Sequence, residues 1–139
     1  MTASIFLLDT NTAAYILSGR SAAARTAFKA TLADAVVAVS AITQAEILFG
    51  LENKPGATRL RAAIEDFLGV VQILPWDSAA AHAYSRLRAR LAAAGKSLSA
   101  LDMLIAAHAV ATNALLVTHD NAFQHATPFI HVVDWATDL

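Results

Sequence analysis

Short apolar runs alternate with longer helical segments along the whole of this 139-residue chain. Five of the runs predict strands, at residues 5–8, 36–39, 70–74, 115–117 and 129–133. Helical patterns are expected at about residues 10–17, 21–32, from 43 onward, 58–68, 77–94 and 99–112. Strands that alternate with helices favour a parallel sheet covered by helices on both faces. We therefore expect an α/β fold with three α/β/α layers and a central, mainly parallel sheet of about five strands.

The length and composition suit one domain over residues 1–139, because no linker, repeat or low-complexity tract divides the chain. The hydrophobic fraction is 57% and the charged fraction 15%, against about 45–50% and about 25% in average globular domains. So much apolar sequence predicts that another chain covers part of the surface. No apolar run is long enough to cross a membrane and no leader pattern begins the chain, so we expect a cytoplasmic protein.

Charge and cysteine content exclude several kinds of site. The chain has no cysteine, which excludes disulfides, thiolate zinc sites and cysteine nucleophiles. Its formal net charge of -1 gives no general attraction for nucleic acid. A polyanionic substrate would therefore need a local basic patch or bound cations.

Four acids lie where the predicted strands end or the following helices begin. Asp9 follows the first strand directly, Asp120 follows the fourth closely, and Glu46 and Asp102 lie near the starts of apolar helical segments. In a parallel sheet all four could meet at the carboxyl edge, where open α/β folds bind ligands. Clustered carboxylates repel one another unless a cation compensates, and Mg²⁺ or Mn²⁺ prefers such oxygen ligands.

Each acid also has a purely structural interpretation as a helix cap. The pairs Thr43 with Glu46 and Ser99 with Asp102 match the capping-box spacing, in which a hydroxyl and an acid three residues later satisfy backbone N–H groups. Asp9 and Asp120 could be N-caps of the segments that follow them. The two interpretations are compatible, because a cap residue is also a carboxylate held rigidly enough to bind a metal.

Four segments, in a fixed order, carry a resemblance to a known family. They are Leu8-Asp9-Thr10-Asn11, residues 40–50, residues 95–109 and residues 116–123, with Asp134-Trp135 near the C-terminus. The chain resembles PIN-domain ribonucleases, and in particular the toxins of VapBC-type toxin–antitoxin pairs. The similarity spans essentially the whole chain.

The resemblance implies a metal-dependent endoribonuclease whose acidic cluster is Asp9, Glu46, Asp102 and Asp120. Mg²⁺ or Mn²⁺ would activate a water that attacks a phosphodiester and leaves a 5′-phosphate. Metal ligands are then expected at Asp9, Asp102 and Asp120, while Glu46 acts partly through water. Thr10, Asn11 and Thr118 could orient the carboxylates or metal-bound water, or could serve only in turns and helix caps.

The fourth acidic position departs from the family pattern. Many relatives have a longer segment with a further acid just before the phenylalanine, whereas Ala122 precedes Phe123 here. Asp120 is then the only acid nearby, with His119 as a weaker candidate. For the other four histidines we expect surface or hydrogen-bonded core positions. Four basic residues could guide an RNA strand past the acids: Lys54, Arg59, Arg61 and Lys96.

The same resemblance implies three partners: an RNA substrate, a VapB-like antitoxin and a second copy of the chain in a homodimer. The apolar segments 13–17 and 47–51 are candidate contact surfaces for the antitoxin. An antitoxin arginine entering the acidic site would replace a cation.

Other classes of function fit the sequence less well. A phosphoacceptor receiver domain needs a paired acid at the first strand and a lysine after a later one, and neither is evident. A catalytically silent interaction module, stabilised by caps at Glu46 and Asp102, remains an alternative. So does a PIN nuclease that processes RNA without acting as a toxin.

Overall fold

The computed structural model describes residues 4–139 and is built on a five-stranded sheet in the order β3-β2-β1-β4-β5. Every neighbouring pair of strands is parallel, so the predicted α/β class with a parallel sheet is confirmed. The strands are β1 (Ile5–Leu8), β2 (Val36–Ser40), β3 (Gln72–Leu74), β4 (Leu115–Val117) and β5 (His131–Val133). The prediction of one domain over residues 1–139 includes residues 1–3, which lie outside the described residues, and stays a prediction.

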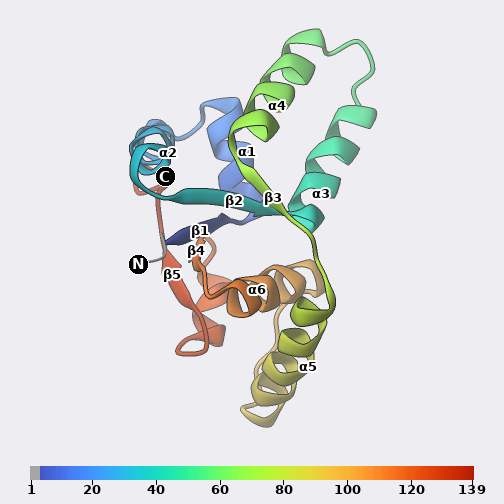
Figure 1. Cartoon of the computed structure of the whole chain (residues 1–139), viewed down its shortest axis with the longest axis vertical. Helices are drawn as coiled ribbons and strands as arrows, with labels where there is room; N and C mark the ends of the chain where they lie inside the picture. The colour runs from blue at the N-terminus through green and yellow to red at the C-terminus, as the bar shows by residue number, and fades with distance from the viewer. Residues whose placement is uncertain (1–3) are drawn as a thin grey trace.

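Six α-helices and one 3₁₀ helix connect the strands in the described part of the chain (Figure 1). They are α1 (Thr10–Ser18), α2 (Ala22–Asp34), α3 (Ala41–Glu52), α4 (Thr58–Val70), α5 (Ser78–Ala93), α6 (Ala100–Thr112) and η1 (Asn121–Ala126). Helices α3 and α4 lie on one side of the sheet, and α5 and α6 lie on the other. Among residues 4–139, no helix is long and apolar enough to cross a membrane.

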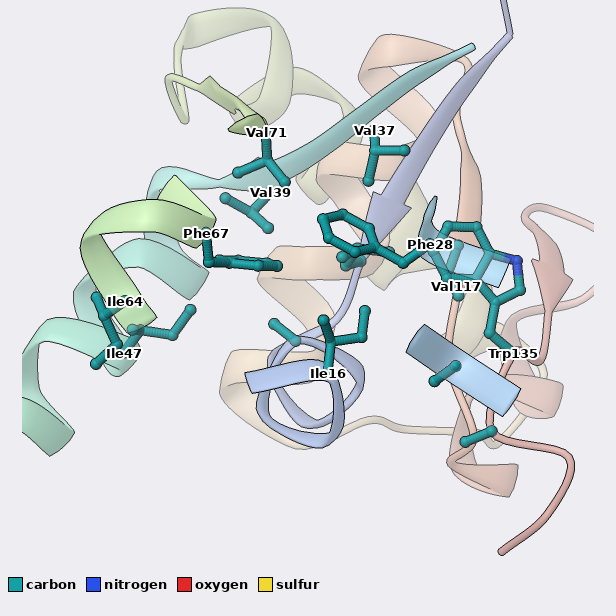
Figure 2. Close-up of a cluster of buried hydrophobic side chains, with 14 of the residues drawn as sticks. Ile16, Phe28, Val37, Val39, Ile47, Ile64, Phe67, Val71, Val117 and Trp135 are labelled. Carbon is teal, nitrogen blue, oxygen red and sulfur yellow. The ribbon is translucent and has the colours of Figure 1, made fainter. Parts of the chain in front are cut away.

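Alternate side chains of the strands bury the two faces of the sheet separately. Leu8, Val39 and Val117 face α1, α2, α3 and α4, and Figure 2 shows this cluster, with Phe28 and Phe67 among the side chains that fill it. Their neighbours Leu7, Ala38 and Leu116 face α5, α6 and η1 in a second cluster. This period of two along each strand is what a sheet covered on both faces requires.

The C-terminal residues close the first of these clusters. The ring of Trp135 packs against Phe6, with the centroids 5.9 Å apart. The Ser21 hydroxyl donates to Asp138 Oδ1 at 2.6 Å and accepts from the Ala24 N–H, so it joins the tail to the N-terminus of α2. This hydrogen bond holds the pKa of the Asp138 carboxyl below its ordinary range.

Three predicted starts are wrong by two residues. Strand β3 begins at Gln72 rather than 70, because α4 continues through Val70 and its Phe67 carbonyl still accepts from the next N–H. Strand β5 begins at His131 rather than 129, because the two preceding N–H groups bond to the Ala126 carbonyl in a turn. Helix α3 begins at Ala41 rather than 43, because the preceding serine caps it.

The order of the strands fixes where a site can form. The chain first runs from β1 through β2 to β3, and then crosses to β4 and β5 on the other side of β1. The direction of winding therefore reverses between β1 and β4. In open α/β sheets, ligands bind in the crevice at the carboxyl ends of the strands beside such a reversal.

The buried alternation predicts a large difference between two leucines. Leu116 is fully buried in β4, whereas Leu48 on α3 is 41% exposed. We expect Leu116→Ala to lower the free energy of unfolding by about 2–5 kcal/mol, and Leu48→Ala to change it by no more than about 0.5 kcal/mol. Urea unfolding of both variants measures the difference, and equal losses would contradict this assignment of the core.

Candidate functional site

Asp9 lies at the reversal point, directly after β1, and its side chain is buried. Its Oδ1 accepts from the Thr12 N–H at 2.8 Å, which caps α1 as predicted. Its Oδ2 accepts from the Thr118 hydroxyl, just beyond β4, at 2.6 Å. The backbone N–H of Asp9 donates to the Val117 carbonyl at 3.0 Å. The carboxylate is thus fixed by both strands that border the crevice.

Burial raises the pKa of Asp9 above its ordinary range. The hydrogen bonds from Thr118 and Thr12 oppose this effect, and the nearby charge of Asp102 adds to it. Desolvation penalises the charged form of a buried acid, so holding this carboxylate ionised costs folding energy. A cation beside it would remove that cost.

A cavity of about 200 Å³ brings three of the four predicted acids together. Its lining residues are Asp9, Thr10, Asn11, Glu46, Ser99, Leu101, Asp102 and Ile105. Asp120 does not line this cavity, but its charge raises the pKa of Asp102, which places it within electrostatic reach. The predicted acids therefore converge at one edge of the sheet, with Asp120 at the margin.

Asp102 occupies the first turn of α6 and is half-buried. Its N–H donates to the hydroxyl of Ser99, the N-cap residue, at 3.3 Å, so the predicted cap at Ser99 is confirmed. Burial raises the pKa of Asp102, the Ser99 hydroxyl lowers it, and the charge of Asp120 raises it further. Asp102 is thus both a residue of the first helical turn and a carboxylate of the cavity.

The predicted capping box of Thr43 and Glu46 is wrong. Ser40 caps α3 by accepting from the Ile42 N–H at 3.1 Å, and no acid lies in the first turn of this helix. Thr43 lies inside the helix, where its buried hydroxyl meets the Thr10 hydroxyl at 3.1 Å. The capping explanation for Glu46 therefore does not apply, and Glu46 faces the acidic cavity from the second turn.

Thr118 joins two of the acids. Its hydroxyl donates to Asp9 and accepts from the Asp120 N–H at 3.0 Å. Asp120 in turn caps η1, since its Oδ1 accepts from the Ala122 N–H at 2.9 Å. One hydroxyl thus sets the spacing between the buried carboxylate and the exposed one.

The donor atoms of this cavity fit a hard divalent cation, because they are carboxylate and hydroxyl oxygens and because two of the acids are disfavoured as anions. As the side chains stand in residues 4–139, no group of three or more Asp, Glu or His could hold one ion. Asp9 is fixed by its two hydrogen bonds, so an ion shared by three acids requires Glu46, Asp102 or Asp120 to turn toward it.

Two histidines have partners that the sequence did not reveal. His119 Nδ1 lies 2.8 Å from Asp134 Oδ2, at the ends of β4 and β5. His119 is therefore hydrogen-bonded to Asp134 and does not line the acidic cavity. His108 is buried on α6, and its Nδ1 lies 2.8 Å from the Ser40 Oγ. Burial lowers the pKa of His108, and the residue is a hydrogen-bonded core histidine as expected. The remaining histidines are exposed: His82, His125 and His131.

The hydrogen bond between His108 and Ser40 connects the two helices that carry Asp102 and Glu46. His108 lies on α6, and Ser40 immediately precedes α3. The contact spans 68 residues of sequence, so no local pattern could have indicated it. It fixes the separation of the two helices.

Most of the predicted basic residues lie away from the acidic cavity, and much of the predicted contact surface is buried. Lys54, Arg59 and Arg61 are exposed in the loop after α3 and the first turn of α4, and none lines the acidic cavity. Within the predicted contact segments 13–17 and 47–51, four side chains face the core instead: Ala13, Ile16, Ile47 and Leu51. The exposed large apolar side chains there are Leu48 and Phe49 on α3, 41% and 62% exposed.

Comparison with known proteins places this chain among a group of nucleases. The model of the PIN domain family matches residues 6–127. The chain is 29% identical to the tRNA(fMet)-specific endonuclease VapC of Shigella flexneri, over 94% of this chain and 98% of the relative. It is 30% identical to the enzyme of the same name from Salmonella typhimurium, over 94% and 97%. The crystal structure of VapBC2 from Rickettsia felis bound to a promoter DNA fragment superposes with a TM-score of 0.86 at 26% identity, covering 94% of this chain and 98% of that one.

The raised pKa of Asp9 predicts a pH-dependent stability difference between the native chain and Asp9→Asn. The folded state keeps the Asp9 proton at pH values where the unfolded chain has lost it, so this group's contribution to stability falls as pH rises through the raised pKa. The free energy of unfolding of the native chain should therefore decline relative to that of Asp9→Asn, with a slope of up to about 1.4 kcal/mol per pH unit between the unfolded and folded pKa values. Urea unfolding from acid to neutral pH, with chelator present, measures this difference.

A second variant tests whether the titration of Asp9 causes that decline. Thr118→Val removes the hydroxyl that stabilises the Asp9 anion, so the fall should move to higher pH. If the free energy of unfolding changed equally with pH in the native chain and in Asp9→Asn, burial would not perturb the Asp9 carboxylate.

Proposed function

The chain belongs to the PIN domain family, and we propose on that premise that it is a metal-dependent endoribonuclease toxin, neutralised by a cognate VapB-like antitoxin. One observation carries the proposal: Asp9, Glu46 and Asp102 line a single cavity at the carboxyl edge of the sheet, where the strand order reverses. Relatives of nearly the same length are named as endonucleases.

Asp9, Asp102 and Asp120 are the residues that would hold Mg²⁺ or Mn²⁺. When bound, such an ion lowers the pKa of a coordinated water and offsets the charge of the phosphate. Asp9 is the fixed member of this set, because Thr12 and Thr118 hold both of its oxygens. Asp102 and Asp120 are less buried, and Asp120 is held through one oxygen only, by its cap of η1.

The other polar residues of the cavity fit roles around the phosphodiester. Glu46, which is half-buried and has no capping role, accepts a proton from the water that attacks phosphorus. The bond from phosphorus to the 3′ oxygen breaks and that oxygen takes a proton from solvent water, which leaves a 5′-phosphate and a 3′-hydroxyl. Thr10 is held by its hydrogen bond to Thr43, and Asn11 is exposed at the mouth of the cavity, where its amide can orient water.

RNA is the substrate class that we propose, and transfer RNA is the first to test. Two relatives are named for tRNA(fMet), so initiator tRNA is the natural starting substrate. These RNAs are in the cytoplasm, which is where we propose that the chain acts.

The proposed protein partners follow from exposed apolar surface. Solved neighbours of this fold are VapBC assemblies, and Leu48, Phe49 and Leu101 of this chain are exposed large apolar side chains. Such side chains are typical of surfaces that another chain covers. We assign them to contacts with the antitoxin or with the second copy in a homodimer. An antitoxin arginine can then enter the acidic cavity as a cation.

Removing an acid should abolish RNA cleavage without unfolding the chain. We expect Asp102→Asn and Asp9→Ala to lower the cleavage rate at least about a hundredfold, since metal stabilisation of such a reaction contributes several kcal/mol. Asp34→Asn, at an exposed acid at the end of α2, is the matched control and should cleave normally. Rates on labelled tRNA and growth arrest on expression test this, and full activity in either purified site variant would overturn the assignment.

Metal binding should be measurable without any RNA. An ion that binds only the folded chain adds RT ln(1 + [L]/Kd) to stability, or about 2.7 kcal/mol at a hundred times Kd. We therefore expect the melting temperature to rise with millimolar Mg²⁺ or Mn²⁺, and to rise much less in Asp102→Asn. A melting temperature that stays flat in the native chain would favour the silent interaction module instead.

A further inference from the structure

A second cavity, of about 350 Å³, lies between α5 and the segment that leads into α6. Its lining residues are Tyr84, Arg88, Ala92, Lys96, Ser97, Leu98, Ala100 and Met103. Two of these are basic and none is acidic, so we call it the basic cavity. The first turn of α6 lies between it and the acidic cavity, because Ala100 and Met103 line one and Leu101 and Asp102 line the other.

Arg88 is held in place by a series of contacts that begins at α6. The Trp76 Nε1–H donates to the Leu104 carbonyl at 3.0 Å, and the Trp76 ring meets Tyr84 edge-on, with centroids 6.2 Å apart. The Arg88 guanidinium lies 5.8 Å from the centroid of the Tyr84 ring and donates to its hydroxyl at 2.8 Å. One N–H of the guanidinium is used in this way, and its other N–H groups remain available to a ligand.

The end of α5 places Lys96 beside Arg88. Gly95 adopts a left-handed conformation with φ of 70°, and the Lys96 N–H donates back to the Leu91 carbonyl at 2.8 Å. The Gly95 N–H donates to the Ala92 carbonyl at 3.0 Å, which completes a Schellman motif. The chain then returns along α5, so the Lys96 side chain lines the same cavity as Arg88.

These two positive charges are not neutralised within the described chain. Across residues 4–139, the one ion pair shorter than 4.0 Å joins His119 to Asp134, so neither Arg88 nor Lys96 contacts a carboxylate. Arg86 and Arg90 lie on the same helix but line a different groove, with Val110 and Phe129. The basic cavity is thus the positively charged cavity that shares the first turn of α6 with the acidic cavity.

We propose that the basic cavity binds the RNA strand beside the cleaved bond, with a backbone phosphate on Arg88 and Lys96 and the adjoining base against Tyr84, Leu98 and Met103. This inference rests on the proposed endoribonuclease function. A guanidinium fork matches a phosphate in geometry, and stacking on an aromatic ring accepts any base. The chain has a net charge of -1 and an acidic cleavage site, so a polyanion needs such an anchor close by.

The test measures binding of a short single-stranded RNA to the full chain carrying Asp102→Asn, with chelator present so that no cleavage occurs. For single strands, each phosphate contact contributes about 0.7 to the slope of log affinity against log salt. Arg88→Gln and Lys96→Gln should each reduce that slope by about 0.7 and raise Kd roughly fivefold near 0.1 M salt. Arg86→Gln, on the same helix, is the matched control and should change neither.

A structural role for Arg88 would give a different result. If Arg88 only supports Tyr84, then Arg88→Gln lowers the urea midpoint while the Kd for RNA stays at the native value, and the proposal is overturned. Lys96→Gln tests the cavity without a change in stability, because Lys96 is exposed and its replacement should leave the urea midpoint unchanged. Arg88→Lys keeps the charge without the fork, so it should keep the salt slope and bind more weakly than the native chain.

Three further outcomes separate this inference from the proposed function. If the native chain cleaves RNA with Mg²⁺ or Mn²⁺ but all three glutamine variants bind RNA alike, the basic cavity is not a substrate site and the nuclease assignment stands. If Arg88→Gln weakens binding of the antitoxin and leaves the Kd for RNA unchanged, the cavity belongs to the protein partner. A native chain that cleaves no RNA overturns both proposals.

Discussion

The hydrogen bond from the Thr118 hydroxyl to the Asp9 carboxylate is the contact on which the site depends. At 2.6 Å it joins the residues that follow β1 and β4, the two strands between which the winding reverses. The same carboxylate caps α1, and the same hydroxyl accepts from the Asp120 N–H. One buried acid therefore organises a helix start, a strand end and the approach to η1. Burial at that position raises the pKa of Asp9, whereas the proposed metal site needs this group as an anion.

Much of this arrangement could be predicted because it depends on local sequence. Strand and helix types follow from apolar periodicity, and caps at Asp9, Ser99 and Asp120 follow from residue type and spacing. Once the strands are parallel, acids at their carboxyl ends must lie along one edge. The start of α3 was not predictable in this way, because Ser40 and Thr43 are both good N-cap residues. The choice was made by tertiary packing, which buries the Thr43 hydroxyl against Thr10, 33 residues away.

The contacts that the sequence could not reveal all join residues far apart in the chain. His108 and Ser40 are 68 residues apart, and the Trp76 indole reaches a carbonyl 28 residues away. An apolar helix such as α6 shows no period from which its buried face could be assigned, so neither partner was identifiable beforehand. These contacts nevertheless set the separation of α3, α5 and α6, and with it the positions of Glu46, Arg88 and Asp102.

Opposite charges on the two sides of one helical turn reconcile the composition with the proposed substrate. A net charge of -1 would not draw RNA to the chain as a whole, and Asp9, Glu46 and Asp102 would repel it. The first turn of α6 separates these acids from Arg88 and Lys96, which keep their charge free of carboxylate partners across residues 4–139. Under the two proposals, a phosphate is attracted at the basic cavity and a phosphodiester bond is cleaved at the acidic cavity. Such local separation of charge leaves no trace in the composition, because the two sets of side chains cancel in the sum.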